Sequence, residues 1–334
     1  MNVRWIHEVA RPHPVLFFDE ACLTQNEYAE LCSAFPQIEK SIGQLVHHNE
    51  ATVNIDLLDV DWNYKEMMGV DCFQALKKHD SFNLPLDRYV QAALEKWRSF
   101  AAKVMTESDT VYILDSALFQ YQIFIFLLKN AAYGELEAFV KKLADILSPL
   151  NPALVYLHRE SVKDSIDYFE KIRGTRSLEK MWERDKHEPY YHNKPKGAEG
   201  ARGFLQTYGE FAAGLYDSID CKKATVEIVG EEWQQCEDAL FAFLSMERTP
   251  PVTAQPVDGL YRAEKYGWEI VVDGLRITDP EGKRRKLLPK SSSEFHLECL
   301  PTTLRYINSD AFVISGDQIC AQWTTLGTVY RRHQ

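Results

Sequence analysis

The sequence predicts an α/β protein in two parts. We expect a parallel sheet with helices on both faces over residues 1–249 and a small antiparallel β-barrel-like domain over residues 250–334. Short apolar runs alternate with long amphipathic segments through the first part, which is typical of parallel sheets. A Thr-Pro-Pro sequence then marks a linker. Beyond it, short alternating runs separated by turns indicate antiparallel strands.

The sequence patterns near the N-terminus differ in how clearly they predict secondary structure. The run from Val3 to Ile6 predicts a strand. Residues 24–35 predict a helix, because Thr24 is a suitable N-cap and Glu27 completes a capping-box pattern. Residues 38–64 show no clear period, and we expect them to be irregular.

The middle of the first part has the strongest patterns. Residues 85–107 predict an amphipathic helix with Trp97 in the core. The sequence VYILDS at residues 111–116 predicts a buried parallel strand that ends at a carboxylate. A long apolar segment follows, and residues 134–147 predict another helix.

The rest of the first part repeats this alternation. Asn-Pro breaks the chain before ALVYL at residues 153–157, which predicts a second buried strand. A helix is expected over residues 161–172, and residues 173–203 are expected to form a mobile basic segment. The expected closing elements are a helix over residues 204–219, a strand over 224–229 and a helix over 232–246.

Composition excludes several classes of protein. Apolar residues make up 45% of the chain, so a packed core is expected rather than disorder. The net charge of −11 opposes binding to the phosphate backbone, and we expect no nucleic-acid partner. The seven cysteines show no disulfide or metal pattern, which indicates a reducing compartment. Without a signal peptide or a membrane-length apolar run, we expect a cytoplasmic protein with no membrane partner.

The order of these landmarks resembles the thymidylate-kinase and deoxynucleoside-kinase group of P-loop proteins over roughly residues 5–246. The carboxylate after VYIL, the proline-led strand NPALVYLHRES and the arginines after it carry the resemblance. The closing segments FLQTYGEFAAGLYDSI and KKATVEIVGEEWQQCEDALFAFL follow in the same order. A looser resemblance links HDSFNLPLDRYVQAALEKWRSFA to an uncharacterised family of bacterial P-loop proteins. The resemblance implies a P-loop kinase-like fold that begins near the family's second strand.

One departure from that family is serious, because the phosphate-binding loop is missing. No Gly-x-x-x-x-Gly-Lys-Ser/Thr sequence occurs in the 334 residues, and Gly282-Lys283 is followed by an arginine in a hairpin turn. Two explanations stay open: an upstream strand–loop–helix segment is absent from this sequence, or the lineage has lost the loop. We favour the first, because a sheet without that strand leaves unpaired backbone groups and exposed apolar edges.

The resemblance implies roles for two carboxylates. Asp115 would belong to the Mg²⁺ shell or act as base toward the acceptor hydroxyl, and is therefore both the catalytic and the metal-site candidate. The alternative is a strand-end carboxylate that caps the next turn. The family often has arginine after this carboxylate, and Ser116 stands there instead. Glu8 follows the first strand, where the family has an acidic residue that contacts the substrate; simple solvent exposure is the alternative.

The resemblance also implies phosphate-binding and acceptor-binding arginines. Arg173 and Arg176 would act as lid residues that spread charge in the transition state, or would belong to a solvated basic loop. Arg88 and Arg98 would line the acceptor pocket.

The second part resembles the small lipocalin-like barrels found in some bacterial enzymes. Tyr261, Trp268, Tyr306 and Trp323 are expected to fill its interior. The basic cluster at residues 283–286 is expected to lie at a hairpin, either as a solvated turn or as a site for an anionic partner.

The implied function is ATP-dependent phosphotransfer to a nucleoside-like or other small hydroxylated acceptor, with ATP and Mg²⁺ bound only if the P-loop exists in the full-length product. We expect the 334-residue chain itself to be inactive. The alternative is a non-catalytic binding or scaffold protein built on a degenerate kinase body. A small-molecule acceptor is the expected partner, and self-association through the open sheet would give a homo-oligomer.

Overall fold

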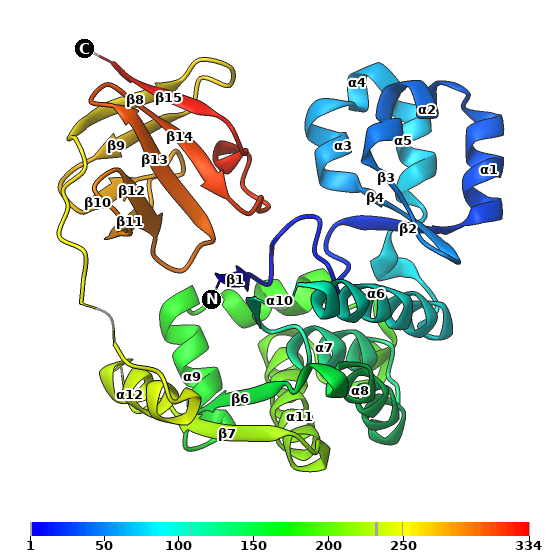
Figure 1. The fold of residues 1–334 in the computed structure, drawn as a ribbon. Helices are drawn as coiled ribbons and strands as arrows, with labels where there is room; N and C mark the ends of the chain where they lie inside the picture. Colours follow the sequence, from blue (N-terminus) through cyan, green and yellow to red (C-terminus); the bar gives the residue numbers. More distant parts are fainter. Residues whose placement is uncertain (1, 108, 231–232, 249, 334) are drawn as a thin grey trace. The chain divides into compact units, whose positions relative to one another are not determined.

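The computed structural model divides into two compact units, each built from more than one stretch of chain. Figure 1 labels the helices and strands and colours them along the sequence. Unit 1 comprises residues 1–83, 109–115 and 249–334, and unit 2 comprises residues 84–108 and 116–248. The residues that the structure describes are 2–107, 109–230, 233–248 and 250–333. Of the helices within those ranges, none combines the length and the apolarity needed to cross a bilayer.

Unit 1 contains a two-stranded parallel sheet. Strand β1 (Asn2–Ile6) pairs with β5 (Thr110–Leu114), and Trp5 lies opposite Ile113. The strand predicted at the N-terminus is therefore confirmed, as is the strand that ends before Asp115.

A small α/β region follows β1 in unit 1 and has its own core. Three antiparallel strands in the order β2-β4-β3 pack against short helices through side chains such as Leu23, Val53 and Ile55. The prediction that residues 38–64 are irregular is wrong, because they contain α2, β3, β4 and α3. These elements are three to seven residues long, which is too short to give a periodic pattern in the sequence. The elements are β2 (Glu20–Thr24), α1 (Gln25–Ala34), α2 (Gln37–Ile42), β3 (Val46–His48), β4 (Thr52–Asp56), α3 (Leu57–Asn63), α4 (Lys65–Met68) and α5 (Val70–Lys77).

The last part of unit 1 is a closed antiparallel barrel of eight strands, which confirms the predicted β module. The first strand, β8, pairs with the last, β15, and closes the barrel. Tyr261 and Trp323 are buried inside, while Trp268 and Tyr306 are partly buried against the same cluster. The strands are β8 (Gly259–Ala263), β9 (Glu269–Val272), β10 (Arg276–Thr278), β11 (Arg284–Pro289), β12 (Glu294–Leu297), β13 (Thr302–Asn308), β14 (Ala311–Gly316) and β15 (Val329–His333).

Unit 2 is mainly helical and contains the second parallel pair, β6 with β7. The long helices predicted from periodicity are confirmed. The prediction that residues 173–203 are mobile is wrong, because they contain α10 and a 3₁₀ turn (Pro189–Asn193). Leu178 and Trp182 pack α10 against its neighbours, but the many charged residues around them obscured the helical period in the sequence. The elements are α6 (Leu86–Thr106), α7 (Gln120–Leu128), α8 (Tyr133–Leu147), β6 (Ala153–His158), α9 (Val162–Arg173), α10 (Ser177–Asp185), α11 (Gly197–Ser218), β7 (Lys222–Glu227) and α12 (Trp233–Leu244).

The parallel strands differ from the prediction in one respect. Parallel strands with helices are present, but they form two sheets of two strands rather than one sheet. Their predicted burial is also wrong: Val111, Ile113 and Leu157 are 41%, 49% and 46% exposed. Among the described residues, each of these strands pairs on one side only, and these three side chains point to sheet faces that are not fully covered, whereas parallel strands are normally interior.

Candidate functional site

Asp115 lies directly after β5, at the carboxyl end of the unit 1 parallel pair. Its backbone N–H donates to the Ile6 carbonyl at 3.0 Å, which fixes the start of the turn to the end of β1. Ser116 follows with φ = 58°, a left-handed conformation that is uncommon for residues other than glycine. The Asp115 side chain is half-buried, so its carboxylate is neither sealed in the core nor fully solvated. This is the strand-end position expected from the sequence.

Glu8 lies two residues beyond the end of β1 and is also half-buried. Because β1 and β5 are parallel, their carboxyl ends meet at one edge of the sheet. Glu8 and Asp115 therefore belong to the same edge; the sequence predicted only that each follows a strand. Two carboxylates at such an edge supply the oxygen ligands that Mg²⁺ prefers.

The segment that leaves β1 is anchored by buried polar residues that the sequence analysis did not single out. The Arg11 guanidinium forms a buried ion pair with Asp56 and lies over the Trp62 ring, 5.0 Å from its centre. His13 is buried, and its Nδ1 accepts the backbone N–H groups of Val15 and Leu16 at 3.2 and 2.9 Å. These contacts hold the loop that begins with Glu8.

The predicted phosphate-binding arginines lie in unit 2, at the turn between α9 and α10. Arg173 ends α9 and Arg176 precedes α10, with Gly174 between them at φ = 92°. Both arginines are exposed, and within the described ranges neither forms an ion pair. The Arg173 guanidinium carbon lies 5.7 Å from the centre of the Phe169 ring. Two guanidinium groups are thus available to an anion on one turn.

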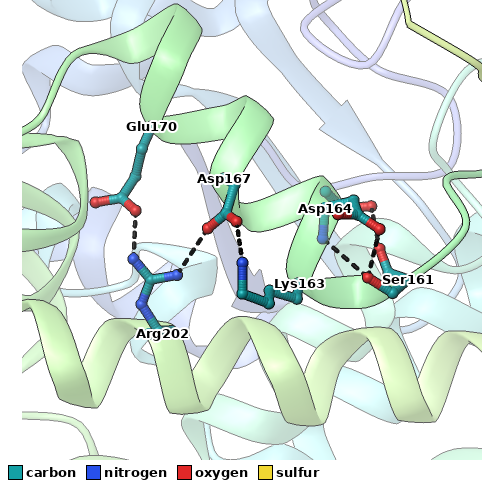
Figure 2. Close-up of polar contacts among 7 residues, drawn as sticks. Ser161, Lys163, Asp164, Asp167, Glu170 and Arg202 are labelled. Carbon is teal, nitrogen blue, oxygen red and sulfur yellow. Dashed lines mark hydrogen bonds and ion pairs between the residues drawn. The ribbon is translucent and has the colours of Figure 1, made fainter.

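A neighbouring arginine is held differently, and Figure 2 shows its contacts. Arg202 of α11 pairs with Asp167 at 3.2 Å and with Glu170, both on α9. Asp167 also accepts a hydrogen bond from Lys163, and the bonds from Lys163 and Arg202 lower the pKa of Asp167. Asp167 and Glu170 are three residues apart, so they share one face of α9. This cluster links α9 to α11, and the Arg202 guanidinium already faces two carboxylates, unlike Arg173 and Arg176.

The acceptor-site candidates lie on α6 in unit 2. Arg88 is half-buried and Arg98 is exposed, while Trp97 between them is fully buried, as predicted. Nearby, the Tyr89 hydroxyl donates to the Gln122 side chain at 2.6 Å, and Gln122 donates to the Ala117 carbonyl at 3.1 Å. This buried network fixes the start of the segment that leads into α7.

The structure does not collect all predicted residues in one unit. Glu8 and Asp115 belong to unit 1, whereas the four arginines belong to unit 2. A hollow of about 520 Å³ lies instead on the barrel, where Lys265, Tyr266 and Leu326 contribute to its lining, and none of the predicted site residues lines it. Among the residues that the structure describes, no three His, Cys, Asp or Glu side chains are grouped to hold a metal ion.

The basic cluster at 283–286 lies at the β10–β11 hairpin, as predicted, and each of its four side chains faces a carboxylate. Arg285 contacts the buried Asp279 at 2.8 Å, and the other three pair with exposed acidic residues. The cluster is therefore locally neutralised, which favours the solvated-turn interpretation. The other pairs are Lys283–Glu281, Arg284–Asp273 and Lys286–Glu298.

No protein-family model, curated protein or solved structure matches this chain. The assignment of function therefore depends on the residues and geometry described above.

Proposed function

We propose that this chain is the body of a nucleotide-kinase-like P-loop protein that, in its full-length product, transfers phosphate from ATP to a nucleoside-like or other small hydroxylated acceptor. The observation that carries the proposal is the pair of carboxylates at one sheet edge. Asp115 directly follows β5, the second of two paired parallel strands, and Glu8 lies two residues after β1, the first. Ligands of open α/β sheets bind outside the carboxyl ends of the strands.

The residues present fit part of the ATP·Mg²⁺ complex. Within unit 1, Asp115 and Glu8 supply carboxylate oxygens suited to Mg²⁺. Within unit 2, taken by itself, Arg173 and Arg176 supply charge suited to phosphate oxygens. The backbone cradle for the triphosphate has no counterpart in these 334 residues. The chain alone does not fit ATP, so ATP binding requires a phosphate-binding loop from elsewhere in the product.

The missing loop favours a second candidate function, a non-catalytic binding or scaffold protein. In that case the carboxylates and arginines would serve the fold or a partner, and no phosphate would be transferred. Translation of the DNA upstream of Met1 separates the two candidates. An in-frame Gly-rich loop ending in Gly-Lys-Ser/Thr supports the enzyme, and a stop codon directly upstream supports the binding protein.

Isothermal titration with ATP·Mg²⁺ tests the main proposal. The 334-residue chain is expected to release little or no heat of binding, whereas a chain extended by an upstream loop is expected to bind. The matched variant is Asp115→Asn in the extended chain, which should retain its fold and lose phosphotransfer by roughly 10²-fold or more. Absent binding in both chains would contradict the kinase interpretation.

A further inference from the structure

The two ends of the barrel differ in how their buried polar groups are satisfied. At the end where β8 begins, two tyrosine hydroxyls donate to the Val257 carbonyl, Tyr261 at 2.9 Å and Tyr306 at 3.5 Å. The chain just before β8 thus supplies the acceptor for both rings. Native structures normally satisfy buried polar groups in this way.

The opposite end, where β8 ends, carries three buried donors that lack an acceptor. They are the indole N–H groups of Trp268 and Trp323 and the hydroxyl of Thr302, and none has a hydrogen-bond partner among the described residues. Trp323 and Thr302 are 3% and 1% exposed. A buried donor without a partner costs roughly 1–3 kcal/mol, so three of them at one end of a barrel require an explanation.

The strand register places these donors at the same end. The Ala263 N–H, at the end of β8, donates to the Trp268 carbonyl at 2.8 Å. Ala263 is the ladder partner of Tyr330, whose hydroxyl donates to the Trp323 carbonyl at 2.8 Å. Thr302 begins β13, whose start pairs with the end of β14 beside the start of β15. Trp268 and Trp323 both pack on the barrel core from this end.

A hollow of about 520 Å³ lies at this end as well. Its lining comes from residues 264–266, in the turn between β8 and β9, and from residues 325–329, which lead into β15. Trp268 follows the first segment by two residues, and Trp323 precedes the second by two. Small-molecule sites commonly measure about 300–1,000 Å³ and occur in the mouths of β-barrels. The segments that line the hollow are therefore the ones that carry the two indoles.

The turn that carries Trp323 is held by local contacts. It is a 3₁₀ turn over Gln322–Thr324, within the connection between β14 and β15. The Thr324 N–H donates to the Ala321 carbonyl at 2.9 Å, and the Thr325 N–H donates to the Gln322 carbonyl at 3.0 Å. Because these bonds join near neighbours, the turn can shift as a unit and expose the indole without breaking the barrel ladder.

The groups at this end define the chemistry of a ligand. An indole N–H only donates, so the ligand must present lone pairs. The Lys265 ammonium lies 4.7 Å from the centre of the Tyr266 ring and, within the described ranges, forms no ion pair, whereas Glu264 is already paired with Arg331 at 3.0 Å. Tyr266 and the 44% exposed Leu326 add apolar surface. Free donors, one cation and an apolar wall suit a carboxylate with an apolar body.

We propose that this end of the barrel binds a small aliphatic carboxylate. Its chain lies against Tyr266 and Leu326, and its carboxylate pairs with Lys265 and accepts hydrogen bonds from the indole N–H groups of Trp268 and Trp323. The site lies at the mouth, because the interior is filled by buried aromatic side chains. None of the sheet-edge carboxylates or the arginines discussed above lines the hollow, so the proposal is independent of phosphotransfer and its test contains no nucleotide.

Two-dimensional ¹H–¹⁵N NMR of the whole 334-residue chain, labelled at the tryptophan indole nitrogens, tests the proposal. The probe is sodium hexanoate, and the control is 1-hexanol, which has the same chain without the carboxylate. The signals of Trp268 and Trp323, assigned by their loss in Trp268→Phe and Trp323→Phe, are expected to move downfield with hexanoate until saturation. Hexanol is expected to bind at least tenfold more weakly. If both signals stay in place, or if hexanol binds as tightly as hexanoate, the proposal is overturned.

A pair of lysine variants makes the test specific and does not depend on the core tryptophans. Lys265→Ala should weaken hexanoate binding at least tenfold and leave hexanol binding nearly unchanged. Lys290→Ala, at the opposite end of the barrel, should bind hexanoate as the parent does. Both side chains are exposed, so both variants are expected to fold even if the tryptophan variants do not. Unchanged hexanoate affinity in Lys265→Ala, or an equal loss in the two variants, would exclude the site.

Discussion

At the residue scale, Arg11 and Asp56 form a buried ion pair that no local sequence pattern predicts. The Arg11 side chain is 1% exposed, and Asp56 also caps α3 by accepting the N–H groups of Leu58 and Asp59. One carboxylate therefore pairs with a buried cation and caps a helix terminus. Removal of one partner of a buried ion pair leaves the other charge uncompensated.

We predict that Asp56→Asn lowers the free energy of unfolding by about 3–5 kcal/mol. Asparagine retains the capping oxygen, so the loss reports the ion pair rather than the cap. Urea denaturation monitored by circular dichroism measures it. The matched control is Asp61→Asn, which breaks an exposed pair with Lys65 and should cost less than about 1 kcal/mol. Equal losses in the two variants would contradict the buried pairing.

Asp19 gives a prediction for pH dependence. Burial raises its pKa above the ordinary 3.8, with further raising from Asp80 and Asp56 and partial lowering from Arg11 and Lys77. The folded state thus binds a proton more tightly than the unfolded state. The associated stability is present below pH 3.8 and is lost as the pH rises through the folded pKa.

Asp19→Asn is therefore expected to raise the unfolding midpoint at pH 7 and to lose that advantage near pH 3. Asparagine suits the position, because Asp19 has φ = 47° and asparagine tolerates left-handed backbone. Thermal unfolding of both proteins from pH 3 to pH 7 provides the comparison. A variant that is less stable than the parent at pH 7 would show that the carboxylate stabilises the fold.

At the element scale, α9 and α11 pack closely at a glycine. A Cβ at Gly209 of α11 would lie 2.6 and 2.7 Å from the two methyl groups of Val162 on α9, whereas a Cβ at Gly203 on the same helix would meet nothing within 4 Å. A glycine-to-alanine substitution is therefore expected to change stability in opposite directions at Gly209 and Gly203 of α11. The Arg202 ion pairs add to this contact, but they are partly exposed and contribute little.

Gly209→Ala is expected to destabilise the protein by about 1–3 kcal/mol through overpacking. Gly203→Ala should stabilise it by up to about 1 kcal/mol, because alanine has the higher helix propensity. Chemical denaturation of both variants gives the two signs. The double change Gly209→Ala with Val162→Ala should recover part of the loss, and a stabilising Gly209→Ala would exclude the close approach.

At the scale of the whole molecule, closure of the barrel makes its interior a continuous core. Phe312 is fully buried there, stacked on Tyr330 at 5.2 Å between ring centres and 4.9 Å from Tyr261. These rings come from β14, β15 and β8, which join the end of the barrel to its beginning. Barrel stability therefore depends on contacts between strands far apart in the sequence.

Phe312→Ala is expected to cost about 3–5 kcal/mol, the range for loss of a buried aromatic ring. Ile307→Ala is the control, because Ile307 lies on neighbouring β13 with its side chain exposed, and should stay within about 0.5 kcal/mol. Near-ultraviolet circular dichroism during denaturation follows the aromatic core directly. A small loss at Phe312 would indicate that the barrel interior relaxes around the missing ring.

The sequence by itself determined the elements whose signals are local. The amphipathic period placed α6 with Trp97 in the core, and the Thr24–Glu27 capping box forms as expected, with N–H···O distances of 2.8 and 3.1 Å. Alternating runs and turns after the linker predicted antiparallel strands, and Asp115 was placed at a strand end. Each of these features depends on residues within a few turns of one another.

Only the tertiary structure decided which strands pair and which side chains remain exposed. The pairing of β1 with β5, the closure of β8 on β15 and the ion pairs of Arg11 and Arg202 all join residues far apart in the chain. Pairing partners follow from the competition among all strands of a fold, which no local period encodes. For the same reason, the exposure of the apolar side chains of β5 and β6 could be recognised only once the strands that pair with them were known.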